Sequence, residues 1–168
     1  TVDYGNGPVV TEASFTAESG TVTTIIGLNG SGKSTLLRCV AALSRPRHGT
    51  VSLEGRDLHR ISHKELATEL AMLPQTAVAP EGLTVADLVA RGRQPHQRWY
   101  RQWSRDDEQV VLDSMRQLNV NQLADRPLDE LSGGQRQRAW IAMCLAQQTP
   151  IILLDELTTH LDIAHAVE

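Results

Sequence analysis

The sequence predicts an α/β protein in which a parallel sheet is interrupted by a helical insertion, and three stretches carry this prediction. Residues 21–26, TVTTII, are β-branched and apolar and stop at Gly27, which is typical of a buried strand. Residues 33–43 follow with apolar side chains at helical spacing, so a strand, a glycine turn and a helix come in succession. Residues 151–154, IILL, are apolar throughout, as in a strand of a parallel sheet that is covered on both faces.

Shorter signals connect these stretches. Residues 50–55, TVSLEG, alternate polar and apolar side chains and end in a turn, which predicts a short strand. Ser62 and Glu65 form a capping-box pattern, which predicts that a helix begins there. Residues 71–74, AMLP, predict a second buried strand.

Helical signals dominate the region between the second and the third predicted buried strand. They begin near Thr84, Ser104 and Gly134 and are separated by the loop-like runs ARGRQPHQRW and DRPLDE. We therefore expect two domains, which are a core formed by residues 1–76 and 149–168 and a helical subdomain formed by residues 77–148.

The composition excludes several classes of protein. The 168 residues, 40% of them hydrophobic, are enough for a domain with its own core, and no apolar stretch approaches the roughly 20 residues of a membrane-spanning helix. A net charge of −4 argues against a broad basic face, so we expect no nucleic-acid partner. Cys39 and Cys144 lie in helix-like apolar patterns without a nearby metal-ligand partner, which favours small core residues in a reducing compartment.

Residues 27–34, GLNGSGKS, fit the pattern of a phosphate-binding loop in the context that it requires, after a predicted strand and before a predicted helix. The glycines allow backbone N–H groups to point at a phosphate, and a helix N-terminus adds about half a positive charge. Lys33 would reach the β- and γ-phosphate oxygens, and Ser34 would supply a hydroxyl to Mg²⁺. The expected ATP contacts in this loop are Gly27, Leu28, Asn29, Gly30, Ser31, Gly32, Lys33, Ser34 and Thr35.

Residues 153–156, LLDE, place two carboxylates at the end of the last predicted strand. Asp155 would hold Mg²⁺ through its water shell, because this ion prefers octahedral oxygen ligands and keeps several waters. Glu156 would orient or deprotonate the attacking water, which contributes about 10²- to 10⁴-fold. A carboxylate pair that only caps a following helix is the alternative, and the phosphate-binding loop in the same chain argues against it.

Residues 131–138, LSGGQRQR, resemble the signature of the ATP-binding-cassette (ABC) transporter family. In physical terms a leucine anchors the segment, a serine caps a helix, and two glycines leave backbone amides bare at the helix start. We therefore expect a second anion-binding helix start, and a capped helix without a ligand is the alternative. The expected signature residues are Leu131, Ser132, Gly133, Gly134 and Gln135.

The resemblance covers nearly the whole chain and implies a P-loop NTPase (RecA-like) core with an inserted helical subdomain that carries the signature. Three further residues match the pattern of this family. Tyr4 resembles the aromatic residue that stacks on adenine, and Gln75 the glutamine that senses the metal and the γ-phosphate. Asp162 resembles the aspartate of a loop that crosses between two subunits. A surface tyrosine and a solvated loop glutamine are the alternatives for the first two.

The family pattern also implies how the parts cooperate. The signature of one subunit covers the ATP that is held by the phosphate-binding loop of the other, so we expect a homodimer with ATP and Mg²⁺ as cofactors. The expected metal contacts are Ser34, Gln75 and Asp155, and the expected catalytic residues are Lys33, Gln75 and Glu156.

The insertion resembles one branch of the family. Residues 89–111, 123–147 and 158–165 are similar to the ATPase subunits of iron-siderophore importers, with cobalamin and haem importers as close relatives. This likeness implies a peripheral subunit at the cytoplasmic face of the membrane. Such a subunit contacts a transmembrane permease through its helical subdomain and does not touch the siderophore. The aromatic residues of WYRQW, 99–103, either fill the core of this subdomain, which is favoured, or contact the permease.

Rival functions and departures from the family pattern qualify this interpretation. A cassette ATPase for DNA repair would insert a long coiled coil between the phosphate-binding loop and the signature. A ribosomal one normally pairs two cassettes in one chain. The sequence has neither feature. A nucleotide-binding module without turnover stays open as an alternative function.

Leu157 replaces the usual proline, which would loosen the turn by about 0.4 to 1 kcal/mol. Neither His160 nor His165 lies where the family places its switch histidine, so we expect a chain truncated at both ends that binds Mg-ATP weakly and hydrolyses little.

Overall fold

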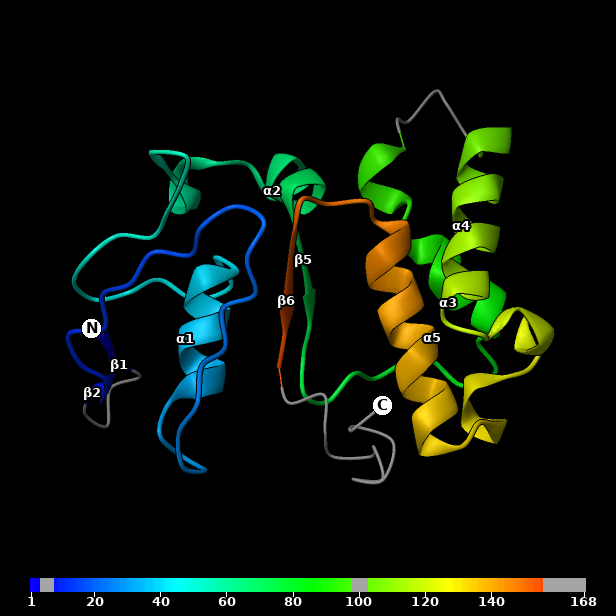
Figure 1. The fold of residues 1–168 in the computed structure, drawn as a ribbon, viewed down its shortest axis with the longest axis horizontal. Helices are drawn as coiled ribbons and strands as arrows, with labels where there is room; N and C mark the ends of the chain where they lie inside the picture. Colours follow the sequence, from blue (N-terminus) through cyan, green and yellow to red (C-terminus); the bar gives the residue numbers. More distant parts are fainter. Residues whose placement is uncertain (4–7, 98–102, 156–168) are drawn as a thin grey trace. The chain divides into compact units, whose positions relative to one another are not determined.

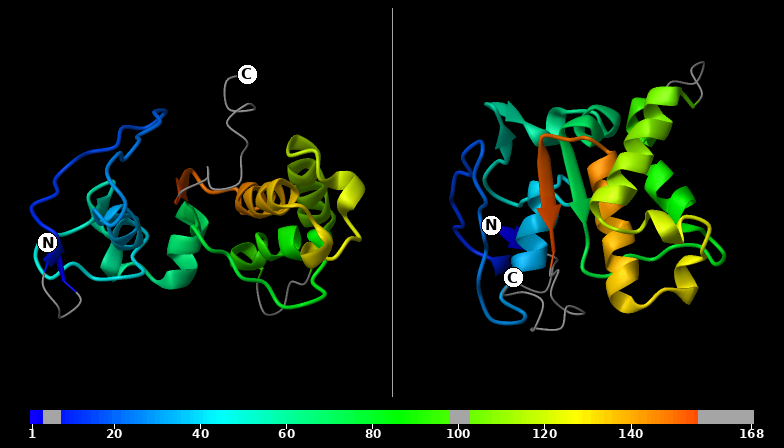
Figure 2. Two further views of the ribbon diagram at one scale, coloured as in Figure 1. Left: turned by 90° about the horizontal axis from the view of Figure 1, so that it is seen from below. Right: turned by 45° about the vertical axis from the view of Figure 1, so that its right-hand side comes forward.

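The computed structural model describes residues 1–3, 8–97 and 103–155. These residues form two compact units, divided between Ser62 and His63, and each unit is described by itself. Figure 1 follows the chain through both units, and Figure 2 shows the same ribbon from two further directions. The expected division into a core and a helical subdomain at residues 76/77 and 148/149 stays a prediction.

The first unit begins with a short hairpin that packs on a helix. Strands β1 (Val2–Asp3) and β2 (Pro8–Val10) pair antiparallel, and both contact helix α1 (Lys33–Val40). The N-terminal ammonium of Thr1 donates a hydrogen bond of 2.8 Å to the carbonyl oxygen of His48. Helix α1 confirms the helix expected at residues 33–43 after the glycine turn, although it ends at Val40.

A second hairpin completes the first unit. Strand β3 (Ser52–Leu53) pairs antiparallel with β4 (Arg56–Asp57), and the 3-10 turn η1 (Leu58–Arg60) follows. The Asp57 side chain caps this turn by accepting a hydrogen bond of 3.0 Å from the backbone N–H of His59. The short strand expected within residues 50–55 is confirmed.

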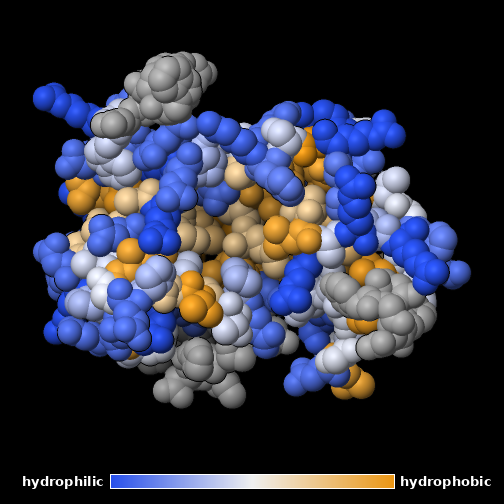
Figure 3. Space-filling model, turned by 180° about the vertical axis from the view of Figure 1, so that it is seen from behind, coloured by the Kyte–Doolittle hydropathy of each residue, from blue (hydrophilic) through white to orange (hydrophobic). Residues whose placement is uncertain are grey.

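The strand expected at residues 21–26 does not form in the structure. The stretch is not assigned to a strand, and the side chains of Val22 and Ile26 are 95% and 90% exposed. The reason is that a strand needs a hydrogen-bonded neighbour, and among the described residues none pairs with this stretch. Figure 3 shows that one face of the structure carries apolar side chains among hydrophilic ones.

The second unit contains a pair of parallel strands. Helix α2 (His63–Glu69) leads directly into β5 (Leu70–Leu73), which pairs in parallel with β6 (Ile151–Leu154). The register runs from Leu70 opposite Ile151 to Leu73 opposite Leu154. Both strands were expected from their apolar runs, and Figure 1 shows them side by side. The parallel pairing confirms the predicted α/β class.

The covering of β6 differs from the prediction that both faces of this strand are buried. Ile152 and Leu154 are 38% and 39% exposed. Helix α5 (Gly133–Ala146) packs on β5, where Ala71 and Leu73 form a buried cluster with Cys144. The α5 packing is centred on β5, so β6 keeps exposed apolar side chains within the described part of this unit.

Three helices form a lobe beside the strands, and each begins with a capping box. Helix α3 (Val85–Arg91) is capped by Thr84 with Asp87, α4 (Arg105–Gln117) by Ser104 with Asp107, and α5 by Ser132 with Gln135. In each box the side chain of the capping residue accepts a hydrogen bond from the backbone N–H of the third helical residue. The side chain of that third residue accepts one from the backbone N–H of the capping residue. The expected helix starts at Thr84 and Ser104 are confirmed, and the third lies at Gly133 rather than Gly134. Three 3-10 turns connect the helices, η2 (Gln94–His96), η3 (Asn121–Leu123) and η4 (Leu128–Glu130).

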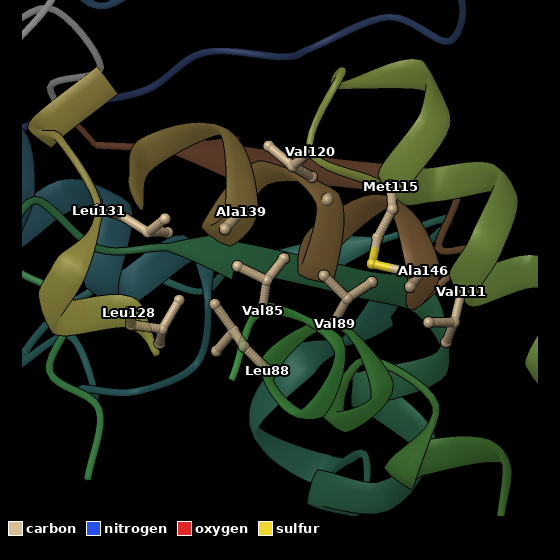
Figure 4. Close-up of a cluster of buried hydrophobic side chains, with 11 residues drawn as sticks. Val85, Leu88, Val89, Val111, Met115, Val120, Leu128, Leu131, Ala139 and Ala146 are labelled. Atoms are coloured by element: carbon tan, nitrogen blue, oxygen red, sulfur yellow. The ribbon is translucent and has the colours of Figure 1, made fainter. Parts of the chain in front are cut away.

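The core of the lobe lies between α3, α4 and α5. Val85, Leu88 and Val89 of α3 point toward the other helices in Figure 4, and each is at most 1% exposed. Leu131 joins this core immediately before α5 begins. The remaining members of the cluster are Val111, Met115, Val120, Leu128, Ala139, Ala142 and Ala146.

Both cysteines are buried free thiols, as the sequence predicted. Cys39 of α1 is 2% exposed and Cys144 of α5 is 1% exposed. The Cys39 sulfur lies 3.1 Å from the hydroxyl oxygen of Ser44. Burial raises the pKa of the Cys144 thiol to about 11, which keeps it protonated and unreactive at neutral pH.

Gly92 lies at a close approach between the end of α3 and α5. It is the C-cap of α3, and its φ of −57° is an ordinary helical angle. A Cβ atom at this position would overlap the carbonyl oxygen of Met143 and lie 3.1 Å from the Cβ atom of Ala146. Glycine is therefore required here because of space and not because of backbone conformation.

We expect Gly92→Ala to lower the free energy of unfolding by about 1–3 kcal/mol, because the added methyl group forces α3 away from α5. Gly134→Ala is the matched control, since the space around Gly134 is open and alanine is favoured over glycine in a helix by about 1 kcal/mol. Urea unfolding followed by circular dichroism measures both. Equal stability of Gly92→Ala and wild type would contradict the close approach.

Candidate functional site

The predicted phosphate-binding loop leads directly into α1, and its glycines adopt conformations that other residues rarely take. Gly30 and Gly32 have φ angles of 79° and 89°, in the left-handed region. Gly32 is also the N-cap of α1, and a Cβ atom there would lie 2.8 Å from the Val10 side chain and 3.0 Å from the carbonyl oxygen of Val9. The backbone therefore passes β2 so closely that only glycine fits.

Lys33 is folded over the loop that precedes it. Its ammonium group donates hydrogen bonds to the carbonyl oxygens of Gly27 and Leu28, both at 2.9 Å. The first turn of α1 contains no acidic side chain, and its leading N–H groups have no partner within the helix. One lysine cation and the positive end of a helix thus lie at the same loop, which suits an anion. Ser34 and Thr35 are half-buried in this first turn.

The second unit places two other expected residues at one edge of its sheet. Asp155 follows the last residue of β6, is 4% exposed, and its backbone N–H donates to the carbonyl oxygen of Leu73 at 3.0 Å. Gln75 lies two residues beyond Leu73 and is exposed. Because Leu73 is opposite Leu154 in a parallel pair, Gln75 and Asp155 both follow the carboxyl ends of neighbouring strands. This edge is where open α/β sheets bind ligands.

The predicted signature lies at the start of α5. The side chain of Leu131 is 6% exposed within the core of the lobe, so this residue anchors the segment as expected. The Ser132 hydroxyl accepts from the Gln135 amide at 3.3 Å, and the Gln135 side chain accepts from the Ser132 amide at 3.0 Å. Open space surrounds the position of a Cβ atom on Gly134, and the first turn carries no acidic residue. The helix start is therefore capped and accessible to an anion.

A buried ion pair at the opposite end of α5 was not found from the sequence. Arg93 is 7% exposed, and its Nε donates to Asp107 Oδ1 at 2.8 Å. Its Nη1 donates to the carbonyl oxygen of Ala146 and to Oε1 of Gln148, both at 2.9 Å. The only signal for it in the sequence is the capping pattern of Ser104 with Asp107, which says nothing of an arginine partner.

The charge state of Asp107 follows from these contacts. Burial acts to raise the pKa of its carboxyl group. Hydrogen bonds from Arg93 and Ser104, together with the positive charge of Arg93, outweigh burial, so the pKa lies below its ordinary value. Asp107 is therefore ionised at neutral pH and pairs with a permanent cation.

A pocket of about 430 Å³ opens in the second unit beside this ion pair. Trp140 and Met143 of α5 form one side, and Gly92 belongs to another. Three polar side chains contribute to it, Arg91, Gln94 and Gln147. The remaining lining residues are Ala67, Val78, Ala79, Leu83, Leu88 and Pro95. Most of the lining residues are apolar, and polar atoms still form nearly half of the lining surface, which suits contact with an amphipathic protein segment.

Several expected residues lie outside the described part of the chain. They are Tyr4, Glu156, Leu157, His160, Asp162, His165 and two of the aromatic residues, Trp99 and Tyr100. The third aromatic residue, Trp103, is 45% exposed and so does not fill the core of the lobe. The predicted phosphate-binding loop belongs to the first unit, and Gln75, Asp155 and the predicted signature belong to the second.

A sequence profile decides the family of this chain. The profile described as ABC transporter matches residues 10–159. The chain belongs to the ABC transporter family. The predicted family membership is thereby confirmed, and so is the P-loop NTPase fold of the ABC ATPase domain.

Individual relatives within this ABC family are similar over the whole chain. The achromobactin transport ATP-binding protein CbrD of Dickeya dadantii is 51% identical over 100% of this chain and 62% of its own length. The ferric enterobactin transport ATP-binding protein FepC of Escherichia coli is 48% identical over the same shares of the two chains. The chain thus spans about three fifths of the length of the curated relatives it matches.

A solved structure agrees with the ABC fold. It is described as an inward-facing conformation of an ABC transporter of the metal-chelate type, and it superposes on this chain with a TM-score of 0.74 and 34% identity. The match covers 89% of this chain and 55% of the other. The similarity therefore extends over both units of the described structure.

We expect Ser132→Ala to lower the free energy of unfolding by about 1 kcal/mol, because it removes the side-chain acceptor at the start of α5. Ser132→Asp is the matched control, since aspartate is an equally good N-cap. Urea unfolding of the three proteins measures the difference. If alanine and aspartate were equally stable at this position, the capping box would contribute nothing.

Proposed function

We propose that this chain binds and hydrolyses ATP to energise the import of an iron-siderophore complex through a membrane permease. The observation that carries the proposal is the glycine-lined loop at the start of α1, with Lys33 folded over it and no acidic residue in the first turn. The names of the relatives, which are transport ATP-binding proteins for siderophores, support the choice of cargo over cobalamin or haem.

The proposed ATP site uses residues that match the family pattern. Backbone amides of residues 30–35 would hold the phosphates, Lys33 would neutralise their charge, and Tyr4 would stack on adenine. A hydroxyl from Ser34 and a carboxylate from Asp155 fit Mg²⁺, because this ion uses few protein ligands and keeps water and phosphate oxygens.

Hydrolysis would depend on two further side chains. Glu156 directly follows Asp155 and would orient or deprotonate the attacking water. Gln75 follows the neighbouring strand, where it would contact Mg²⁺ and report the γ-phosphate to the helical lobe. When bound, Mg²⁺ would supply positive charge to the phosphates as the bond to the γ-phosphate breaks.

We further propose that the active form is a homodimer. One chain carries two accessible helix starts, at α1 and at α5, and neither has an acidic residue in its first turn. In a head-to-tail pair, residues 131–135 of one subunit would cover the phosphates held by the loop of the other. Asp162 would lie in a loop that crosses between the subunits.

The permease would contact the helical subdomain, which we place at residues 77–148. The pocket lined by Val78, Trp140 and Met143 is the proposed contact, because its apolar lining could receive a short amphipathic segment. Among the described residues, no helix is both long enough and apolar enough to cross a bilayer. Because the relatives are named as transport ATP-binding proteins, we propose a peripheral position at the cytoplasmic face of the membrane, with no direct contact to the siderophore and no nucleic-acid partner.

We expect Lys33→Ala to abolish nucleotide binding, because it removes a phosphate contact. We expect Glu156→Gln to leave the phosphate contacts and Mg-ATP binding intact while turnover falls by about 10²-fold or more. Lys64→Ala is the control, since Lys64 is the other lysine of the chain and donates to the carbonyl oxygen of Gln97. Calorimetric titration with Mg-ATP and a steady-state phosphate assay measure the two properties. Retained affinity in Lys33→Ala, or unchanged turnover in Glu156→Gln, would refute the proposed site.

We expect Val78→Asp to weaken association with the permease by about tenfold, because it places a charge on an apolar contact. Val78 is 84% exposed, so the change leaves folding intact. Gln117→Asp adds the same charge at the exposed end of α4, away from the pocket. Co-purification of the intact protein with its permease, followed by dissociation measurements, compares the two variants. Equal retention of both would place the permease elsewhere.

A further inference from the structure

We propose that Arg93 is a positioning residue that fixes the C-terminal end of α5 to the wall of the pocket, so that a partner bound in the pocket moves the whole signature helix. This inference rests on the proposed function, because Arg93 would transmit movement from the proposed permease contact to the proposed ATP contact. Arg93 itself does not line the pocket and is not an expected ATP contact.

The contacts of Arg93 join its own segment to two others that are distant in the sequence, the start of α4 and the end of α5. Its guanidinium group bonds the Asp107 carboxylate at the start of α4, the carbonyl oxygen of Ala146 in the last turn of α5, and the Gln148 side chain just beyond α5. An arginine is suited to this role because its planar fork donates in several fixed directions. Both charged groups are nearly inaccessible to solvent, with side-chain exposures of 9% and 13%. A buried cation without these acceptors would be strongly unfavourable, which holds the three segments together.

The same stretch of chain forms a wall of the pocket. Arg91, Gly92, Gln94 and Pro95, which flank Arg93 on both sides, all line the cavity. Gly92 lies directly against the backbone of Met143, so the wall has no freedom to slide along α5. A partner that presses on this wall therefore presses on the residues that hold α5.

A second set of bonds attaches the end of α5 to the pocket. His96 donates from Nε2 to the carbonyl oxygen of Gln147 at 2.7 Å. The Gln147 side chain, which also lines the pocket, donates to the carbonyl oxygens of Ala67 at 2.7 Å and Leu70 at 3.2 Å. The last turn of α5 is thus tied to the pocket wall and to the junction between α2 and β5.

Helix α5 is suited to carry a displacement from one end to the other. It runs without interruption from Gly133 to Ala146, and a helix of this length extends about 20 Å. Its first residues belong to the proposed signature, and its last residue accepts the bond from Arg93. A movement of the clamped end therefore reaches the proposed signature without passing through a flexible joint.

We call the bonds of Arg93 to Asp107, Ala146 and Gln148 the clamp. Arg93→Lys tests it, because lysine keeps the positive charge but cannot donate to all three acceptors in the same fixed directions. Arg116→Lys is the matched control. Arg116 pairs with Asp113 at 2.9 Å, close to the 2.8 Å of the buried pair, but both side chains are about half exposed. Gln148→Asn is a milder variant that shortens one acceptor, and asparagine tolerates the left-handed φ of 52° at this position.

The first measurement uses the intact protein reconstituted with its permease. We expect Arg93→Lys to lower the permease-stimulated kcat by about tenfold, a usual size for coupling between two sites, while the KM for ATP and the unstimulated rate stay within about twofold of wild type. Gln148→Asn should give a smaller loss, and Arg116→Lys none. Equal loss of stimulated and unstimulated rates, a raised KM, or no change in Arg93→Lys would overturn the proposal.

The second measurement does not depend on ATP hydrolysis. In hydrogen–deuterium exchange of the protein alone, Arg93→Lys should speed exchange in residues 91–97 and 143–148 and leave residues 27–40 unchanged, because only the first two segments are clamped. Unchanged exchange in the clamped segments would overturn the proposal. Absence of any permease-stimulated hydrolysis in wild type would instead refute the proposed function, and the exchange result would still decide whether the clamp exists.

Discussion

The packing of α5 between β5 and the helices α3 and α4 is the constraint on which the second unit depends. One side of the helix buries Cys144 against the strand, and another buries Ala139, Ala142 and Ala146 in the core of the lobe. Small residues at these positions allow close approach, and Gly92 of α3 completes the contact. The helix can therefore shift only together with its neighbours, because close-packed interiors leave no room for independent movement.

The two ends of α5 are held by different physical means. At the N-terminal end, local hydrogen bonds between Ser132 and Gln135 satisfy the helix start and leave the glycine amides accessible. At the C-terminal end, the long-range ion pair of Arg93 and Asp107 is reinforced by bonds from Arg93 to the carbonyl oxygen of Ala146 and to the Gln148 side chain. An accessible end suits ligand binding and a clamped end suits transmission, which is the combination that the proposed link between a permease and a nucleotide would need.

The predicted phosphate-binding loop illustrates how a local motif keeps its geometry without the strand expected before it. Residues 21–26 pair with no described strand and are mostly exposed, yet Gly30 and Gly32 hold left-handed angles and Lys33 folds back on Gly27 and Leu28. The loop depends on short-range hydrogen bonds and on the contact of Gly32 with β2.

The sequence by itself determined the features that arise from neighbouring residues, namely the glycine turn before α1, the capped starts of α3 and α4, the two apolar strands and the ABC signature. Such features follow from spacing and side-chain chemistry within about one turn of helix. Only the tertiary structure decided the clamp around Arg93, whose partners are 14 to 55 residues away in the sequence. It also decided which apolar side chains are covered, since Val22, Ile26 and Ile152 remain exposed. Burial depends on which elements pack together, and no local pattern contains that information.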